Sequence, residues 1–171
     1  MEPFISKIDY EVPIFKNHIK KKKNYDKIVK KTGIFETYKV KNKHSVIDLA
    51  LKICKRNLKD LQACDTIIFV TQTPKYLLPS CSSIIQGKLG LKQNILTFDI
   101  NMGCSGFIHG LSVATSLIKS KMSANVALIC ADTYSHYFSN NNKNKFIFSD
   151  AATLTVIKKR RRKRIGPFLF G

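Results

Sequence analysis

The chain has 171 residues, of which 44% are hydrophobic, and this length and composition are typical of a globular domain rather than of a disordered segment. Thirty Lys and Arg residues against eleven Asp and Glu residues give a formal net charge of +19, which predicts either an acidic partner or a solvated, lysine-rich surface. No apolar run reaches the roughly 18 residues that a membrane-spanning helix needs, and this excludes a transmembrane segment.

The N-terminal third predicts a strand, a loop and then a helix. Residues Phe4–Ile14 are rich in β-branched and aromatic side chains and predict a first strand that leads into a lysine-rich surface loop. Thr32-Gly33-Ile34 marks a turn. Ser45 is followed three residues later by Asp48, which is a variant capping box, and apolar residues then recur at helical spacing. This pattern predicts a helix over about Val46–Leu58.

The middle and C-terminal parts alternate between strand and helix patterns. Thr66–Thr71 is a continuous apolar and β-branched run, which predicts a strand that is buried on both faces. The elements expected after it are a helix over Ser80–Leu89 closed by Gly90, a strand over Asn94–Ile100, a long helix over Phe107–Ile118, and strands over Asn125–Cys130 and Ala151–Ile157.

This alternation predicts an α/β fold with a mainly parallel central sheet. We expect residues 1–157 to form the domain. We expect 158–171 to be a basic tail or truncated loop, because the run Lys158–Arg164 breaks the pattern. A second basic run, Lys20–Lys23, lies in the predicted N-terminal loop.

A glycine-flanked cysteine, Cys104, stands where the third of these strands passes into the long helix, within Asn101–Phe107 (NMGCSGF). The glycines permit a tight turn and close packing of the helix on its neighbours. The helix dipole and the unpaired N–H groups of a helix N-terminus favour a thiolate and can stabilise an oxyanion on an attacked thioester carbonyl. From these residues alone, Cys104 is either an exposed nucleophile at an elbow or a small buried cysteine in a tight turn.

The other four cysteines have no comparable setting. Cys54 lies on the apolar stripe of its predicted helix and Cys130 ends a predicted buried strand, so both are expected in the core. Cys64 and Cys81 have no activating context. The absence of a CxxC pair, of metal-ligand spacing and of a secretory leader predicts free thiols in the cytoplasm and no bound metal.

Five segments together carry a resemblance to a known family. They are, in chain order, Thr71–Ser80, Gly90-Leu91, Asp99–Phe107, Ala131–Ser135 and Phe148–Ala152. In this order and spacing they resemble the ketoacyl-acyl-carrier-protein synthase III branch of the thiolase-like enzymes. The resemblance extends from Lys31 to Ile157.

The resemblance implies a reaction of fatty acid biosynthesis. The family's cysteine, matched by Cys104, accepts an acyl group from acyl-coenzyme A as a thioester, which is covalent catalysis. Malonyl-acyl carrier protein then decarboxylates and attacks this thioester in a Claisen condensation, releasing carbon dioxide and a 3-oxoacyl carrier protein. The implied partners are acyl carrier protein, a coenzyme A thioester and a second copy of the chain, and no cofactor is expected beyond the substrates.

The resemblance also implies positions in the fold, which has two similar halves in a five-layered αβαβα molecule. This chain matches the N-terminal half. Lys31 and Thr32 match a segment near the coenzyme A entrance, and Leu78 matches a position that reaches across the dimer into the neighbour's acyl pocket. The family's histidine and asparagine lie in the C-terminal half, so we expect that domain to be absent and the chain to be an inactive or partial fragment. Ser149 replaces a glycine usual before Asp150, which we expect to strain the turn.

Two alternatives remain. The first keeps the fold but makes the protein a related thiolase-like acyltransferase, because the choice of acceptor is not encoded in this half. The second is a basic nucleic-acid-binding module, in which the basic runs neutralise phosphates. No helix-turn-helix, zinc or RNA-recognition signature is interleaved with these runs, so we expect neither a nucleic acid nor a membrane as partner.

Overall fold

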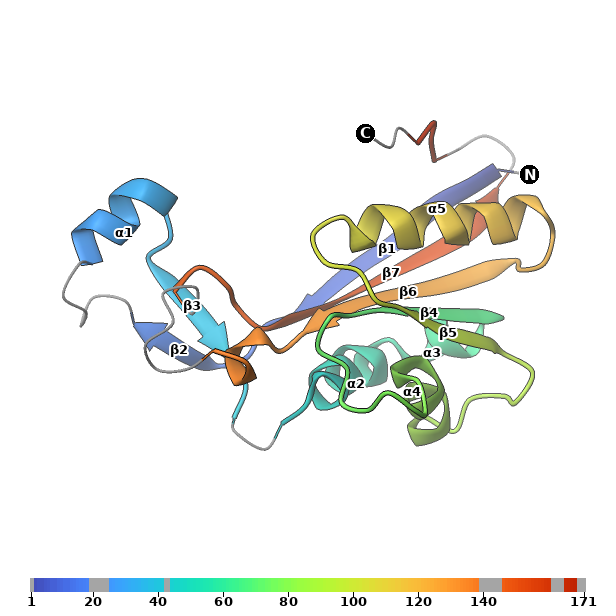
Figure 1. The fold of residues 1–171 in the computed structure, drawn as a ribbon. Coiled ribbons are helices and arrows are strands. Elements are labelled where there is room, and N and C mark those ends of the chain that lie inside the picture. The colour runs from blue at the N-terminus through green and yellow to red at the C-terminus, as the bar shows by residue number, and fades with distance from the viewer. Residues whose placement is uncertain (1, 19–24, 42–43, 139–145, 161–164, 169–171) are drawn as a thin grey trace.

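The computed structural model describes residues 2–18, 25–41, 44–138, 146–160 and 165–168, which are arranged around one five-stranded sheet (Figure 1). Its strands are β1 (Glu2–Glu11), β4 (Thr66–Val70), β5 (Leu96–Ile100), β6 (Asn125–Asp132) and β7 (Ala151–Arg160). The helices against this sheet are α2 (Val46–Arg56), α3 (Leu58–Gln62), α4 (Cys81–Lys88) and α5 (Gly106–Lys119). The remaining elements are β2 (Phe15–His18), α1 (Tyr25–Thr32), β3 (Glu36–Lys39) and the short 3₁₀ helix η2 (Tyr134–His136).

The strands of the sheet follow the order β1-β7-β6-β4-β5. β4 pairs in parallel with both β5 and β6, whereas β7 pairs antiparallel with both β6 and β1. Because β7 is antiparallel to both neighbours, β1 runs in the same direction as β4, β5 and β6. The sheet is therefore mainly parallel with one reversed strand, and the predicted α/β fold is confirmed.

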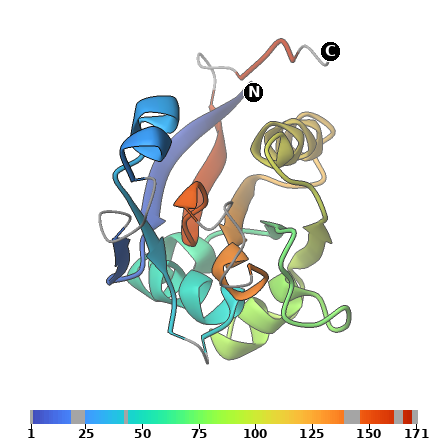
Figure 2. The ribbon, with the colours of Figure 1, turned by 60° about the vertical axis from the view of Figure 1, so that its left-hand side comes forward.

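Helices cover both faces of this sheet. α2, α3 and α4 lie on one face and α5 lies on the other (Figures 1 and 2). β4 shows why, since successive side chains of a strand point to opposite faces. Ile67 and Phe69 belong to the apolar cluster under α2 and α4, while Ile68 and Val70 belong to the cluster under α5. All five residues of β4 are buried, as the apolar run predicts.

The predicted capping box at the start of α2 is confirmed. Ser45 Oγ accepts the backbone N–H of Asp48 at 3.4 Å, and the Asp48 carboxylate accepts the backbone N–H of Ser45 at 2.8 Å. The helix ends at Arg56, two residues before the predicted end, and the chain restarts as α3. At Asn57 the backbone leaves the helical conformation, and the side-chain amide donates to the Ile53 carbonyl at 2.9 Å.

The segment between Ile14 and Gly33 differs most from its prediction as a surface loop. It forms β2 and α1, and β3 pairs antiparallel with β2. An ion pair between Lys16 and Glu36, with Nζ and Oε1 2.9 Å apart, links the two short strands. Their register joins residues about twenty positions apart in the sequence, so no local turn signal announces the pairing.

The two basic runs are described only in part. Lys20–Lys23 and 161–164 lie outside the described residues, whereas Lys158, Lys159 and Arg160 belong to β7. The strand therefore continues three residues beyond the predicted end at Ile157. Within the part of the chain that the structure describes, no helix is long and apolar enough to cross a membrane.

Candidate active site

The site is built at the turn between β5 and α5, and Cys104 lies exposed at its apex. The N–H of Gly106 donates to the carbonyl of Gly103 at 2.7 Å, which closes the turn just before the helix. Ser105, the N-cap residue, makes no side-chain capping hydrogen bond. Within the described part of the chain, four backbone N–H groups of this turn donate to no acceptor, namely those of Cys104, Ser105, Phe107 and Ile108. The helix N-terminus therefore presents unpartnered donors beside an exposed thiol, which decides against the buried-cysteine alternative.

Two glycines let α5 pack closely on the sheet and so fix the turn. A Cβ atom on Gly106 would lie 2.5 Å from Val70 Cγ1, and one on Gly110 would lie 2.6 Å from Leu128 Cδ1. Such separations are too short for real contacts, so a side chain at either position would push the helix away from β4 or β6. The close packing expected from the glycines is confirmed.

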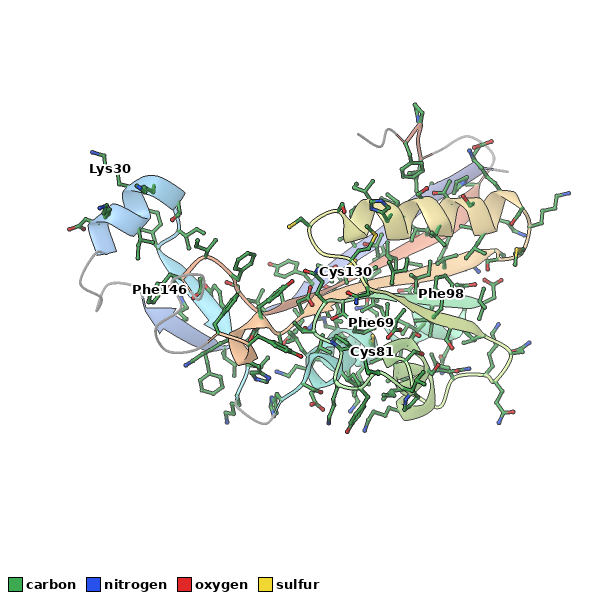
Figure 3. All side chains as sticks on the ribbon, viewed as in Figure 1. Lys30, Phe69, Cys81, Phe98, Cys130 and Phe146 are labelled. Atoms are coloured by element: carbon green, nitrogen blue, oxygen red, sulfur yellow. The ribbon has the colours of Figure 1, made fainter. Side chains whose placement is uncertain are left out.

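The other four thiols lie in settings that suppress ionisation. Burial raises the pKa of Cys54 and of Cys64 to about 12, and it raises the pKa of Cys81 and of Cys130 to about 11. Cys54 is confirmed as a core residue, whereas Cys130 is half-buried at the rim of the cluster under α5. Figure 3 shows Cys81 and Cys130 within the fold, on α4 and β6. Cys104 is thus the exposed member of the five.

His109 lies on α5, one helical turn beyond Cys104, whereas His44 and His136 lie outside that helix. The Nδ1 atom of His109 lies 2.9 Å from the carbonyl oxygen of Ser105, a hydrogen bond to its own helix. His44 and His136 are exposed, His136 within η2.

Lys31 and Thr32 lie at the end of α1, which stands apart from the N-terminus of α5 in both views (Figures 1 and 2). The Thr32 hydroxyl donates to the Ile28 carbonyl at 2.8 Å and accepts the N–H of Ile34 at 3.1 Å. These bonds shape the predicted turn, where Gly33 has a φ of +69°. The structure does not bring Lys31 and Thr32 to Cys104, and their contact with coenzyme A stays a prediction.

Leu78 lies on the loop between β4 and α4, and 85% of its surface is exposed. Its neighbour Leu77 is 93% exposed. Two adjacent leucines that face solvent carry a cost unless another surface covers them. Within this chain neither leucine is buried, and the role of Leu78 in a neighbour's acyl pocket stays a prediction.

Ser149 does not strain the turn before Asp150, so that expectation is wrong. Among the described residues other than glycine, Lys121 alone has a positive φ. Ser149 Oγ accepts the N–H of Tyr38 at 3.1 Å, and the N–H of Asp150 donates to the Tyr38 carbonyl at 2.9 Å. The serine therefore adds a hydrogen bond that joins this turn to β3.

Two carboxylates that hold the loops after β4 and before α4 were missed from the sequence, Asp99 and Asp132. Asp99 on β5 accepts the N–H groups of Cys81 at 2.6 Å and of Ser82 at 2.9 Å, which ties the start of α4 to the strand that leads to Cys104. Asp132 at the end of β6 binds the residues that follow β4. The available signal was their position near the carboxyl ends of β5 and β6, the parallel strands on either side of β4, where loops and side chains converge.

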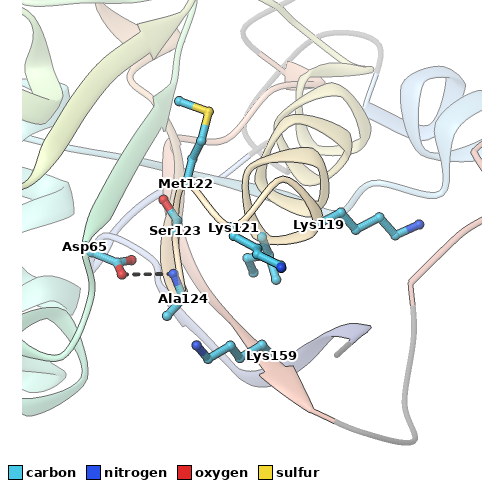
Figure 4. Close-up of a pocket in the computed structure, with 8 residues that line it drawn as sticks. Asp65, Lys119, Lys121, Met122, Ser123, Ala124 and Lys159 are labelled. Carbon is cyan, nitrogen blue, oxygen red and sulfur yellow. Dashed lines mark hydrogen bonds between the residues drawn. The ribbon is translucent and has the colours of Figure 1, made fainter.

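A pocket lies at the far end of α5 (Figure 4). It has a volume of about 330 Å³, and its lining includes Lys119, Lys121 and Lys159. The Asp65 carboxylate in it accepts the N–H groups of Ala124 and Asn125, so its oxygens already serve the backbone. No cysteine is among the residues that line this pocket, and we place the candidate site at the Cys104 turn.

Comparison with known proteins agrees with this geometry. Residues 98–171 match the family model of 3-oxoacyl-[acyl-carrier-protein (ACP)] synthase III. The β-ketoacyl-[acyl-carrier-protein] synthase III of Fusobacterium nucleatum is 36% identical over 132 residues, which are 74% of this chain and 40% of that protein. The corresponding protein of Caldanaerobacter subterraneus is 36% identical over 135 residues, which are 76% of this chain and 40% of that protein.

The fold is also similar to that of a solved structure from the same family of enzymes. A crystal structure of a 3-oxoacyl-(acyl-carrier-protein) synthase III superposes with a TM-score of 0.91 at 30% identity, covering 100% of this chain and 55% of that one. The chain thus spans about 40% of the length of the curated relatives above and about half of this structure.

Proposed function

The chain belongs to the 3-oxoacyl-[acyl-carrier-protein] synthase III family and has its thiolase-like fold, and from this premise we propose that Cys104 is the acyl acceptor of the family's condensation. One observation carries the proposal: an exposed thiol stands at the start of α5 beside four N–H groups for which the described residues provide no acceptor. Thioester exchange on a cysteine requires a nucleophilic thiol and hydrogen-bond donors for the oxyanion, and the turn supplies both.

The first step is transfer of the acyl group. The Cys104 thiolate attacks the carbonyl carbon of acyl-coenzyme A, and the oxygen gains negative charge that N–H groups at the turn stabilise. Collapse of this intermediate expels the coenzyme A thiolate and leaves a thioester on Cys104. In the second step malonyl-acyl carrier protein loses carbon dioxide, and the resulting carbanion attacks the thioester carbonyl. The Cys104 thiolate then leaves, and 3-oxoacyl carrier protein is released.

An acidic carrier protein fits the charge of this chain. Nine of the eleven acidic residues take part in hydrogen bonds or ion pairs within the fold. They are Asp9, Glu11, Glu36, Asp48, Asp60, Asp65, Asp99, Asp132 and Asp150. Among the described basic residues, the ion pairs involve only Lys7, Lys16, Lys52, Arg56 and Lys158. The excess of unpaired basic side chains favours long-range attraction of an acidic protein.

The remaining assignments extend the same proposal. Lys31 and Thr32 contact coenzyme A, and Leu78 reaches the acyl pocket of a second copy in a homodimer. The exposure of Leu77 and Leu78 supports such a contact between copies. The free thiols of the chain suit a reducing compartment, and we place the protein in the cytoplasm.

A condensation assay tests the function. Residues 1–171 are extended with the remaining length of the Fusobacterium relative and supplied with acetyl-coenzyme A and malonyl-acyl carrier protein. We expect 3-oxoacyl carrier protein from this protein, none from its Cys104→Ala variant, and product again from Cys130→Ala as the matched control. Residues 1–171 alone should be slower by at least about 10²–10³, because the resemblance places the charge-stabilising histidine and asparagine outside them.

Two results would overturn the function. Product from Cys104→Ala at the unaltered rate would remove the nucleophile. Acyl transfer to Cys104 followed by release to an acceptor other than malonyl-acyl carrier protein would favour the related acyltransferase. Rising salt should slow condensation more than acylation, because only the condensation step needs the carrier protein.

A further inference from the structure

The turn that follows β4 is fixed to the end of β6 by one carboxylate oxygen. Asp132 Oδ1 accepts the N–H groups of Gln72 at 2.8 Å and Thr73 at 3.1 Å. It also accepts the hydroxyls of Thr71 at 3.0 Å and Thr73 at 2.9 Å. Thr73 Oγ1 in turn accepts the N–H of Thr133 at 2.8 Å. With both threonines buried, the backbone on either side of Gln72 is held firmly.

The side chain of Gln72 is held as well. The hydroxyl of Tyr134 donates to Gln72 Oε1. The Tyr134 ring packs against Phe138 and Phe148, with ring centroids 5.9 Å and 5.4 Å away. Burial and the nearby Asp132 and Cys104 raise the pKa of Tyr134, so that its hydroxyl keeps the proton that it donates.

The held amide lies against the residue that precedes the nucleophile. A Cβ atom on Gly103 would lie 2.6 Å from Gln72 Oε1 and 2.9 Å from Gln72 Cδ. The amide therefore occupies the space that a side chain at this position would need. The Gly103 carbonyl also accepts the N–H of Gly106, the bond that closes the turn at Cys104.

We propose that Gln72 is a positioning residue for Cys104: its amide, held by Tyr134 and by the Asp132 network, supports Gly103 and keeps the turn in the form that presents the thiol. The proposal rests on the proposed function of Cys104 and adds how the site is held. Three segments that are distant in sequence thereby meet at the amide group of Gln72. They are the residues that follow β4, the residues that follow β6 and the turn that precedes α5. A side chain on the residue before Cys104 would have to displace the amide of Gln72.

The substitution Gln72→Glu separates charge from shape. A carboxylate of the same size can still accept the Tyr134 hydroxyl, but it places a negative charge beside the turn, which disfavours a thiolate at Cys104. We expect the alkylation of Cys104 by iodoacetamide to shift by roughly one pH unit toward higher pH. Gln62→Glu is the matched control, because Gln62 is exposed at the end of α3, and it should leave the pH profile unchanged.

The neutral substitution Gln72→Met tests the support itself. Loss of the amide should slow acyl transfer from acetyl-coenzyme A to Cys104 by on the order of tenfold, since small misplacements of reacting groups are costly. Gln72→Asn, which keeps an amide on a shorter side chain, should be intermediate. Thermal unfolding followed by circular dichroism checks that each variant folds, and if Gln72→Glu does not fold, the Met and Asn pair decides the question.

Alkylation profiles that coincide for wild type, Gln72→Glu and Gln62→Glu would overturn the proposal, as would Gln72→Met transferring acyl groups at the wild-type rate. Alkylation needs no coenzyme A. The alkylation profiles of wild type and Gln72→Glu can therefore differ as expected while the wild-type chain takes up no acyl group. That result would refute the proposed function and leave the positioning role of Gln72 standing.

Discussion

The N-termini of α4 and α5 each carry a cysteine, yet their surroundings are opposite. At α4, Ser80 Oγ accepts the N–H of Ser83 at 3.3 Å, and Asp99 accepts the N–H groups of Cys81 and Ser82. At α5, the N-cap residue makes no side-chain capping bond, and the N–H groups of Cys104, Ser105, Phe107 and Ile108 have no acceptor among the described residues. The N–H groups at the start of α4 thus have side-chain acceptors, whereas those at the start of α5 have none among the described residues.

The comparison shows that a helix N-terminus does not make a cysteine reactive by itself. Cys81 is fully buried, and its burial, together with the charge of Asp99, raises its pKa to about 11. These effects outweigh the favourable helix dipole. Cys104 has the same favourable helix dipole but is exposed, and no carboxylate among the described residues accepts the N–H groups at the start of α5. The distinguishing features are thus access and unfilled hydrogen-bond donors.

Alkylation should separate the two cysteines by the widest margin. A thiol of pKa about 11 is ionised to only about 10⁻³ near pH 8, and burial further limits access to Cys81. We expect iodoacetamide to modify Cys104 at least about 100-fold faster than Cys81, as followed by peptide mass mapping. Because a raised pKa keeps the thiol protonated, labelling of Cys81 should stay low until the pH approaches 11. Similar rates for both cysteines near pH 8 would break the comparison.

Removing the N-cap hydroxyls of α4 and α5 should change the free energy of unfolding by different amounts, a smaller effect than the difference in alkylation rate. Ser80→Ala removes the acceptor for the Ser83 N–H and should lower the free energy of unfolding by about 1 kcal/mol. Ser105→Ala removes no capping bond and should change it by less than about 0.5 kcal/mol. Urea unfolding measures both values. An equal loss in the two variants would mean that the start of α5 is capped in solution.

The sequence predicts best where neighbouring residues determine the structure. Ser45 and Asp48 are three residues apart and form their capping box within one turn, and the apolar run of β4 needs only burial on both faces. The glycines around Cys104 likewise predict a turn from local residues. The pairing of β2 with β3 depends on a register across a long gap, and no local signal encodes it.

The site is predictable only in part for the same reason. The strand-to-helix position of Cys104 follows from local patterns, but its exposure and the unpartnered N–H groups depend on what the rest of the chain leaves open. The contact of Gln72 with Gly103 and Tyr134 joins three segments that sequence spacing does not bring together. The filled N-terminus of α4 depends in the same way on Asp99, which comes from a neighbouring strand.

Acyl labelling tests the central claim most directly. The chain with all five cysteines is incubated with radiolabelled acetyl-coenzyme A, and the label is located by peptide mapping. We predict about one acetyl group per chain, bound as a thioester on the peptide that contains Cys104, with none on Cys81 and none at all in the Cys104→Ala variant. Label that persists at the same level in Cys104→Ala, or that maps to another residue, would contradict the assignment of Cys104 as the acyl acceptor.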